Sequence, residues 1–169
     1  TGVPSIIFGL FVYIALIIGT GSSYAGYKGS LALALLMLPV VIRSAEVVLL
    51  LVPGALREAA LALGAPRWRV IASVVLPTAL PGMVTGVLLA IARAAGETAP
   101  LLFTAGATFK TTTDLGGFMN SLPVQIYNDV TSPTTAVVDR AWGAALTLVA
   151  MILILNLIAR VVSRRSRLA

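Results

Sequence analysis

The sequence contains no cysteine and no histidine, and only 6 of its 169 residues are acidic. Without cysteine there are no disulfide bonds and no thiolate metal sites. The absence of cysteine does not indicate whether the compartment is oxidising or reducing. Without histidine there is no imidazole to act as a catalytic base or a metal ligand. The chain also lacks the G-x-x-x-x-G-K-[ST] loop of ATP-hydrolysing proteins, because its GYKGS segment is too short and differs in order. We therefore expect no enzyme activity, no cofactor and no metal.

Charged residues are scarce as well, at 11% of the chain against 59% hydrophobic residues, and the mean hydropathy is +1.02. This composition is too apolar for a soluble domain and predicts an integral membrane protein. The net charge of +6 would suggest a nucleic-acid partner if the basic residues formed a stripe on a soluble face. They lie instead at the ends of apolar segments, where they determine membrane topology. We expect no nucleic acid.

Long apolar runs are what the chain does have. A helix needs about 20 mostly apolar residues to cross the hydrocarbon core of a bilayer. Four segments approach this length: 3–18, 30–52, 79–103 and 141–159. The first is short, but it can be extended to Gly21. The sequence therefore predicts an all-α helical bundle with about four spans. The chain opens without an initiator methionine or a charged leader, so we expect it to be the later part of a longer protein.

The second and third spans are separated by a segment that does not suit a bilayer. Pro53 and Gly54 break the helix, a short amphipathic helix is expected over 55–63, and a turn follows at 64–66. A second short helix, rich in arginine and tryptophan, is expected to reach Pro77. We interpret 55–77 as a surface loop that docks on another molecule.

Charges interrupt two of the spans. Pro39 should kink the second span, where Arg43 and Glu46 lie three residues apart on one helix face and can pair. In the third span Arg93 and Glu97 are four residues apart and also share a face.

Glycines and a proline shape the third span. Gly82 and Gly86 form a small-xxx-small face that favours close helix packing. Pro100 cannot donate a hydrogen bond to the carbonyl of Gly96, so a bend is expected beside Glu97. A polar loop with three aspartates follows, and it should hold a short helix around 119–127.

Lysine and arginine are distributed unequally between the two sides of the predicted bundle. The loop after the second span and the tail carry seven of them, against three on the other side: Arg57, Arg67, Arg69, Arg160, Arg164, Arg165 and Arg167 against Lys28, Lys110 and Arg140. By the positive-inside rule, the docking loop and the tail are cytoplasmic and the aspartate-bearing loop faces outward.

One spacing in the docking loop is specific. Glu58, Ala59 and Ala60 are followed by Gly64, Val74, Leu76 and Pro77. This pattern resembles the EAA-x3-G-x9-I-x-L-P loop of binding-protein-dependent ABC import permeases, with valine in place of isoleucine. The segments GVPSIIFGLF, LPVVIRSAE and ARAAGETAPLLFTAG also resemble the PstA type of phosphate permease, and the resemblance covers most of the chain.

The resemblance implies a multi-pass subunit of a bacterial or archaeal cell (inner) membrane, with about two further spans before residue 1 and a single permease domain over 1–169. It implies a path for inorganic phosphate shared with a second, PstC-like permease, and phosphate delivery by an external binding protein. ATP would be bound by a dimer of PstB-like subunits, and the loop 55–77 would couple to them through the motif residues.

The residues themselves leave two alternatives open for the short helix expected over 55–63. Leu56, Ala59, Ala60 and Leu63 are spaced three and four apart and give 55–63 one apolar side, as expected of a helix that fits a partner's groove. A short amphipathic helix lying among lipid headgroups would show the same pattern. The motif spacing favours coupling to the ATPase.

Two interpretations also compete for the charged spans. An arginine or aspartate at the bilayer centre costs about 2.5 to 3.5 kcal/mol on insertion scales, so such residues usually face a bundle interior or a wet cavity. Arg93 and Glu97 could be a buried ion pair that only fixes packing. Alternatively, Arg93 contacts a passing oxyanion with its two-pronged guanidinium while Glu97 orients or releases it. Arg43 is a second cationic candidate, or it snorkels beside Glu46.

The functional prediction is therefore the permease subunit of an ATP-driven phosphate importer. A bidentate arginine does not select phosphate over sulfate or molybdate, so a permease for another oxyanion stays open. A passive channel or an assembly scaffold, which needs no ATPase, is the alternative of a different class.

Overall fold

The computed structural model describes residues 4–108, 110 and 112–165. Within these ranges every regular element is a helix, which confirms the all-α prediction. In chain order the elements are α1 (Ser5–Val12), the π-helix η1 (Tyr13–Ile18), α2 (Gly26–Leu50), α3 (Gly54–Ala62), α4 (Arg67–Val70), the π-helix η2 (Ile71–Val75), α5 (Leu76–Ala94), α6 (Ala99–Thr104), α7 (Leu122–Val130) and α8 (Thr135–Arg165).

Three described helices are long and apolar enough to cross a bilayer: Gly26–Leu50, Arg67–Ala94 and Thr135–Val161. The first apolar segment, Ser5–Ile18, is shorter. Its helix rises about 21 Å at 1.5 Å per residue, which is less than the roughly 30 Å of a hydrocarbon core. Of the four predicted spans, three are thus confirmed as long helices. The extension of the first to Gly21 was wrong, because Gly21 adopts a positive φ of 63° and turns the chain.

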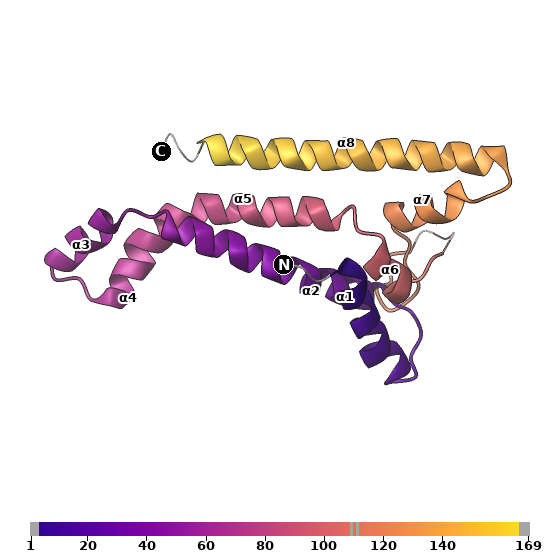
Figure 1. Cartoon of the computed structure of the whole chain (residues 1–169), viewed down its shortest axis with the longest axis horizontal. Coiled ribbons are helices and arrows are strands. Elements are labelled where there is room, and N and C mark those ends of the chain that lie inside the picture. Colours follow the sequence, from indigo (N-terminus) through magenta and orange to yellow (C-terminus); the bar gives the residue numbers. More distant parts are fainter. Residues whose placement is uncertain (1–3, 109, 111, 166–169) are drawn as a thin grey trace.

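Figure 1 shows how these helices are arranged. The helices α2, α5 and α8 run along the long axis of the molecule, while α1 slants away from them. The pair α3 and α4 lies at one end together with the C-terminal end of α8, and α6 and α7 lie at the other end. The docking loop and the end of α8 were predicted on the same side of the bundle, and the arrangement agrees.

The helices α2 and α5 are held together by small residues. A Cβ added to Gly82 would come within 2.6 Å of Val48 Cγ1, and a Cβ on Gly86 would overlap the side chain of Ser44. Only glycine allows the two backbones this close approach. The predicted packing face of Gly82 and Gly86 is confirmed, and its partner is α2.

The second short helix of the docking loop was predicted to stop at Pro77, and this was wrong. Residues Arg67–Ala94 form one continuous helix through α4, η2 and α5. A proline inside an α-helix removes one hydrogen bond and clashes with the preceding turn. Here the wider π-helical turns of η2 come directly before Leu76 and Pro77, and a local change of helix type of this kind lets the chain pass a proline without ending.

The third span was predicted to continue to residue 103 and to bend near Gly96. The structure ends α5 at Ala94 instead and begins the separate helix α6 at Ala99. Pro100 occupies the first turn of α6, where its missing N–H costs nothing. Glu97 therefore lies in the turn between two helices, not on α5.

The end of the bundle that holds α6 and α7 has its own small core of Leu101, Ala105 and Val124, covered in part by Leu33 and Leu102. Backbone hydrogen bonds join α2 to this end, because Ala25 N–H donates to Thr104 O at 3.1 Å.

Lys28 near the start of α2 is 1% exposed. Its ammonium group donates to Ser22 Oγ at 2.6 Å and to Ser23 O at 2.5 Å. Ser22 in turn donates to Leu16 O, a carbonyl of η1. The buried cation thus lies next to the C-terminal end of a helix, where the helix dipole favours positive charge.

The short helix expected around 119–127 is α7, Leu122–Val130, and it begins three residues later because Ser121 caps it by accepting a hydrogen bond from Val124 N–H. Asp129 near its end is 4% exposed and forms a two-pronged ion pair with Arg140 of α8, at 2.9 and 3.1 Å. The last span predicted over 141–159 is the central part of α8.

Candidate functional site

The helix α3 carries the EAA residues and projects from the end of the bundle (Figure 1). None of its residues is buried, and Glu58 and Ala59 are exposed while Ala60 packs against the cluster of Val52, Val70, Val75 and Ala79. The predicted apolar side is open to a partner, since Leu56 is 45% exposed and Leu63 is 89% exposed.

Two interactions fix the position of α3. Arg57 Nη2 donates to Leu49 O of α2 at 2.8 Å, which ties α3 to the end of the preceding span. Gly64 has a φ of 80°, a conformation that favours glycine, and its N–H donates to Leu61 O at 2.9 Å. The sharp turn after α3 that the sequence predicted at Gly64 is confirmed.

A hollow of about 490 Å³ lies between α3 and the helices next to it, α2, α4 and η2. Its lining is mostly apolar, with an arginine on each of two elements, and comprises Leu49, Arg57, Leu61, Arg67, Val70, Ile71 and Val75. The last motif residues, Leu76 and Pro77, lie beyond this hollow at the start of α5 and are exposed. The motif therefore extends from α3 into the long helix and is not confined to a loop.

Arg43 and Glu46 form the ion pair predicted on α2. Arg43 Nη1 lies 2.7 Å from Glu46 Oε2, and the side chains are 68% and 52% exposed within this chain. They border a hollow of about 420 Å³ that is also lined by Leu38, Pro39 and Ile42. Both charged groups are thus open to whatever surrounds this face of α2.

Arg93 and Glu97 also approach each other, but more loosely. Arg93 Nε lies 3.8 Å from Glu97 Oε1, and the side chains are 65% and 17% exposed. At this distance the pair is an ion pair without a hydrogen bond. The guanidinium of Arg93 is consequently available to a further partner.

The face on which Arg93 lies follows from helix geometry. Arg93 is seven residues after Gly86, which is two turns, so it shares the side of α5 that faces α2. The Arg93 side chain is 65% exposed. Figure 1 shows the ribbons of α2 and α5 diverging toward the C-terminal end of α5. Arg93 therefore lies on the α2-facing side of α5, near the end where the two helices separate.

The chain does not bring Arg43 and Arg93 together. Gly82 faces Val48 and Gly86 faces Ser44, so the antiparallel register of α2 and α5 places Arg93 level with Met37. Met37 is six residues from Arg43, which is about 9 Å along the helix axis. Each arginine instead has its own carboxylate, Glu97 or Glu46.

Comparison with known families decides the class of the chain. The family model described as "Binding-protein-dependent transport system inner membrane component" matches residues 1–168. The chain belongs to this family. It is an integral membrane protein, in agreement with the apolar helices, and the family agrees with the spacing of the EAA motif.

Curated relatives narrow the comparison further. The chain is 47% identical over 172 residues to "Phosphate transport system permease protein PstA 1" of Mycobacterium tuberculosis strain H37Rv, covering 99% of this chain and 56% of that protein. It is 49% identical to PstA of Mycobacterium leprae (92% and 52% covered) and 45% identical to PstA of Yersinia pestis (97% and 55% covered). The chain thus spans about half the length of these relatives. No solved structure matches.

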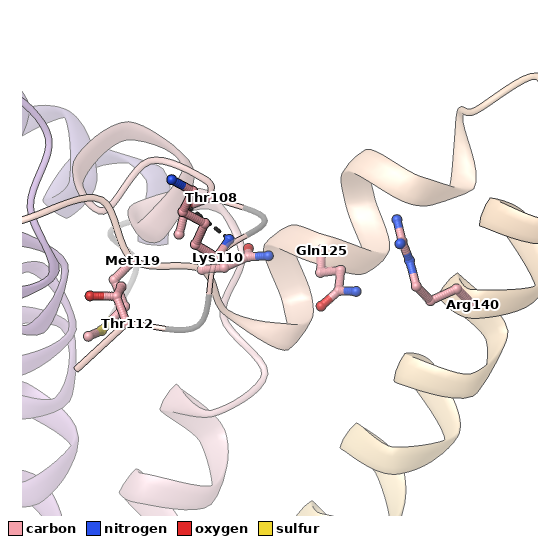
Figure 2. Close-up of a pocket in the computed structure, with 7 residues that line it drawn as sticks. Thr108, Lys110, Thr112, Met119, Gln125 and Arg140 are labelled. Atoms are coloured by element: carbon pink, nitrogen blue, oxygen red, sulfur yellow. Dashed lines mark hydrogen bonds between the residues drawn. The ribbon is translucent and has the colours of Figure 1, made fainter. Parts of the chain in front are cut away.

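The sequence did not indicate a polar feature of this chain at the end opposite α3. A hollow of about 350 Å³ is lined by Thr108, Lys110, Thr112, Met119, Asn120, Gln125 and Arg140. From the sequence, Lys110 and Arg140 were counted only as basic residues that determine membrane topology. Both residues line one hollow because the segment between α6 and α8 folds back, and no local sequence pattern encodes that fold. Figure 2 shows Gln125 lying between them.

Proposed function

We propose that the chain is part of the permease subunit of an ATP-driven phosphate importer in the cell inner membrane, and that it crosses the membrane several times. The similarity to proteins named phosphate transport system permease supports phosphate as the substrate. The observation that carries the mechanism is the continuity of Arg67–Ala94. One unbroken helix begins next to the exposed EAA helix and ends at Arg93 and Ala94.

In this proposal α3 couples the permease to a PstB-like ATP-binding dimer. Its exposed side offers Leu56 and Leu63 for an apolar contact and Glu58 for a polar rim, as interfaces with an apolar centre require. Ala60 and the Arg57–Leu49 hydrogen bond attach α3 to the bundle, so that a displacement of α3 moves the end of α2 as well. Gly64, Leu76 and Pro77 carry the connection into α5.

The anion path is proposed to pass between this chain and a second, PstC-like permease, along the exposed guanidinium of Arg93. A guanidinium binds an oxyanion with two parallel hydrogen bonds and stays charged at any physiological pH. Glu97 at 3.8 Å holds the side chain loosely and competes with the anion for it, which favours release. Arg43, paired with Glu46, is a second contact farther along the same pair of helices.

The test is ATP-driven uptake of radiolabelled phosphate by proteoliposomes that hold the full-length importer with its external binding protein. Glu58→Lys is expected to lower uptake at least tenfold, while the same change at the opposite end, Asp139→Lys, leaves it within twofold. Uptake by Glu58→Lys at the unmodified rate would overturn the coupling proposal. Uptake without ATP would identify a passive channel.

The contact between Arg93 and the transported anion is tested with Arg93→Gln, and Arg160→Gln on α8 is the matched control. We expect Arg93→Gln to lower uptake at least tenfold while the complex still assembles and hydrolyses ATP. Competition by sulfate or molybdate at equal concentration would indicate a permease for another oxyanion. Full uptake by Arg93→Gln would leave only the role of α3 standing.

A further inference from the structure

The polar hollow is lined by the segment between α6 and α7 and by residues of α7 and α8. Figure 1 shows α6 and α7 at the end of the bundle away from α3. Figure 2 shows Thr108, Lys110 and Thr112 on the segment after α6, Gln125 on α7, and Arg140 reaching toward α7 from α8. None of these residues contributes to the docking end or to the charged pairs of α2 and α5. The volume of about 350 Å³ falls in the range of small-molecule sites.

Charge in this hollow is of one sign. Among the described residues that line it, two are cationic, Lys110 and Arg140, and none is acidic. The nearest carboxylate partner is Asp129, which accepts from Nε and Nη2 of Arg140. That pair fixes the guanidinium, whose Nη1 makes no hydrogen bond within the described part of the chain. Arg140 is thereby held rigidly with one donor group to spare.

Three neutral side chains of the hollow carry both acceptor and donor groups. Thr108 Oγ1 accepts from Lys110 N–H at 3.2 Å, and Thr112 Oγ1 accepts from Asp114 N–H at 3.1 Å. Asn120 Oδ1 accepts from Ser121 N–H at 3.0 Å. The two hydroxyl protons and the Asn120 amide protons make no hydrogen bond within the described residues, so they can donate to a ligand.

We propose that this hollow is an anion site that receives a tetrahedral oxyanion before it enters the spans. Cationic groups with hydroxyl and amide donors suit a ligand that only accepts hydrogen bonds, as phosphate largely does. The identification of the ligand as inorganic phosphate depends on the proposed function; the selection of an oxyanion depends only on the donors. A lipid phosphate headgroup presents the same chemistry and is the second source to be distinguished.

Lysine acylation provides a direct readout that does not need transport. The sequence holds two lysines, and Lys28 is 1% exposed while Lys110 is exposed. The assembled importer in zwitterionic nanodiscs is treated with an amine-acylating reagent, and peptide mapping follows Lys110. We expect 5 mM inorganic phosphate to slow acylation of Lys110 at least about fivefold relative to chloride at equal ionic strength, because a bound anion covers the ammonium group.

A variant that weakens the donors without removing the reporter lysine completes the test. Thr112→Val and Asn120→Asp together should abolish protection by phosphate, and Thr113→Val, next to the site on an exposed position, should retain it. Protection in anionic nanodiscs without phosphate would assign the site to lipid headgroups. Equal acylation rates in phosphate and chloride, in both lipids, would overturn the proposal.

The acylation test of the anion site and the uptake test of the proposed importer can fail independently of each other. Protection of Lys110 together with failed ATP-driven uptake would leave the anion site standing and remove the importer. Uptake that depends on Arg93 without protection of Lys110 would do the reverse.

Discussion

Gly86 of α5 lies so close to Ser44 of α2 that a methyl group on the glycine would overlap the serine side chain. Ser44 is the neighbour of Arg43, and Gly86 precedes Arg93 by two helical turns. The closest approach of the two spans is therefore also what sets the positions of both candidate path arginines. Packing and proposed function depend on the same few residues.

Gly86→Val should force α2 and α5 apart. Overpacking of this kind costs about 1 to 3 kcal/mol. We expect a lower thermal unfolding temperature in detergent, whereas Gly143→Val on α8, where a Cβ meets no neighbour within 4 Å, has little effect. The double variant Ser44→Gly and Gly86→Ala should keep most of the wild-type unfolding temperature, because it exchanges the small residue between the helices. A failure of Gly86→Val to destabilise would contradict this contact.

Gly64→Ala tests the turn after the EAA helix. The position has a φ of 80° and open space around it, so the substitution acts on the backbone alone. A residue with a Cβ pays about 1 to 2 kcal/mol in the left-handed region. We expect weaker binding of the ATPase dimer, measured by co-purification of the full complex.

Gly54→Ala, at the other end of α3, is the matched control for Gly64→Ala. Its surroundings are equally open and its φ is not positive. It should leave co-purification unchanged. Equal effects of the two substitutions would show that the turn geometry is not what matters.

The long helices and the EAA helix could be predicted because run length, helical period and motif spacing are local properties of the chain. Two helix boundaries could not be predicted from the sequence. Pro77 was expected to end a helix, but the π-helical turns of η2 accommodate it, and such turns leave no simple sequence pattern. Glu97 was placed on a helix that in fact ends at Ala94, where Gly96 and Pro100 cooperate to separate two helices.

Contacts between segments that are distant along the chain could not be predicted from the sequence. The pair Asp129 and Arg140 is 11 residues apart across a helix–turn–helix, so neither helical nor strand periodicity relates the two residues. Arg43–Glu46 could be predicted because a spacing of three corresponds to one helical turn. Arg93 and Glu97 do approach each other, but not for the predicted reason, because Glu97 lies in the turn after α5.

The Asp129–Arg140 pair predicts a pH dependence of stability. The hydrogen bond from Arg140 lowers the pKa of the Asp129 carboxyl from its ordinary value. A carboxyl with a lowered pKa stabilises the folded state above its unfolded pKa of about 3.9, and that stabilisation is lost as pH falls through the folded value. Asp129→Asn should therefore unfold at a lower temperature than the wild type at pH 7, and the difference should shrink below about pH 4.

Thermal unfolding in detergent between pH 7 and pH 2 measures this difference. Asp139→Asn is the control, because Asp139 is exposed and has no ion pair within the described residues. A constant difference between Asp129→Asn and wild type across the whole range would contradict the electrostatic account and leave only a packing effect.

The separation of the two path arginines predicts independent contributions to transport. Arg43 and Arg93 are about 9 Å apart along the helix axis and each pairs with its own carboxylate, and sites that far apart without shared partners usually act additively to within about 0.5 kcal/mol. Arg43→Lys and Arg93→Lys each keep the charge and lose the two-pronged geometry. The double variant should lower kcat/KM for phosphate uptake by the product of the two single effects. A double variant no worse than the stronger single one would mean that one anion contacts both arginines at once, which would require α2 and α5 to close toward each other during transport.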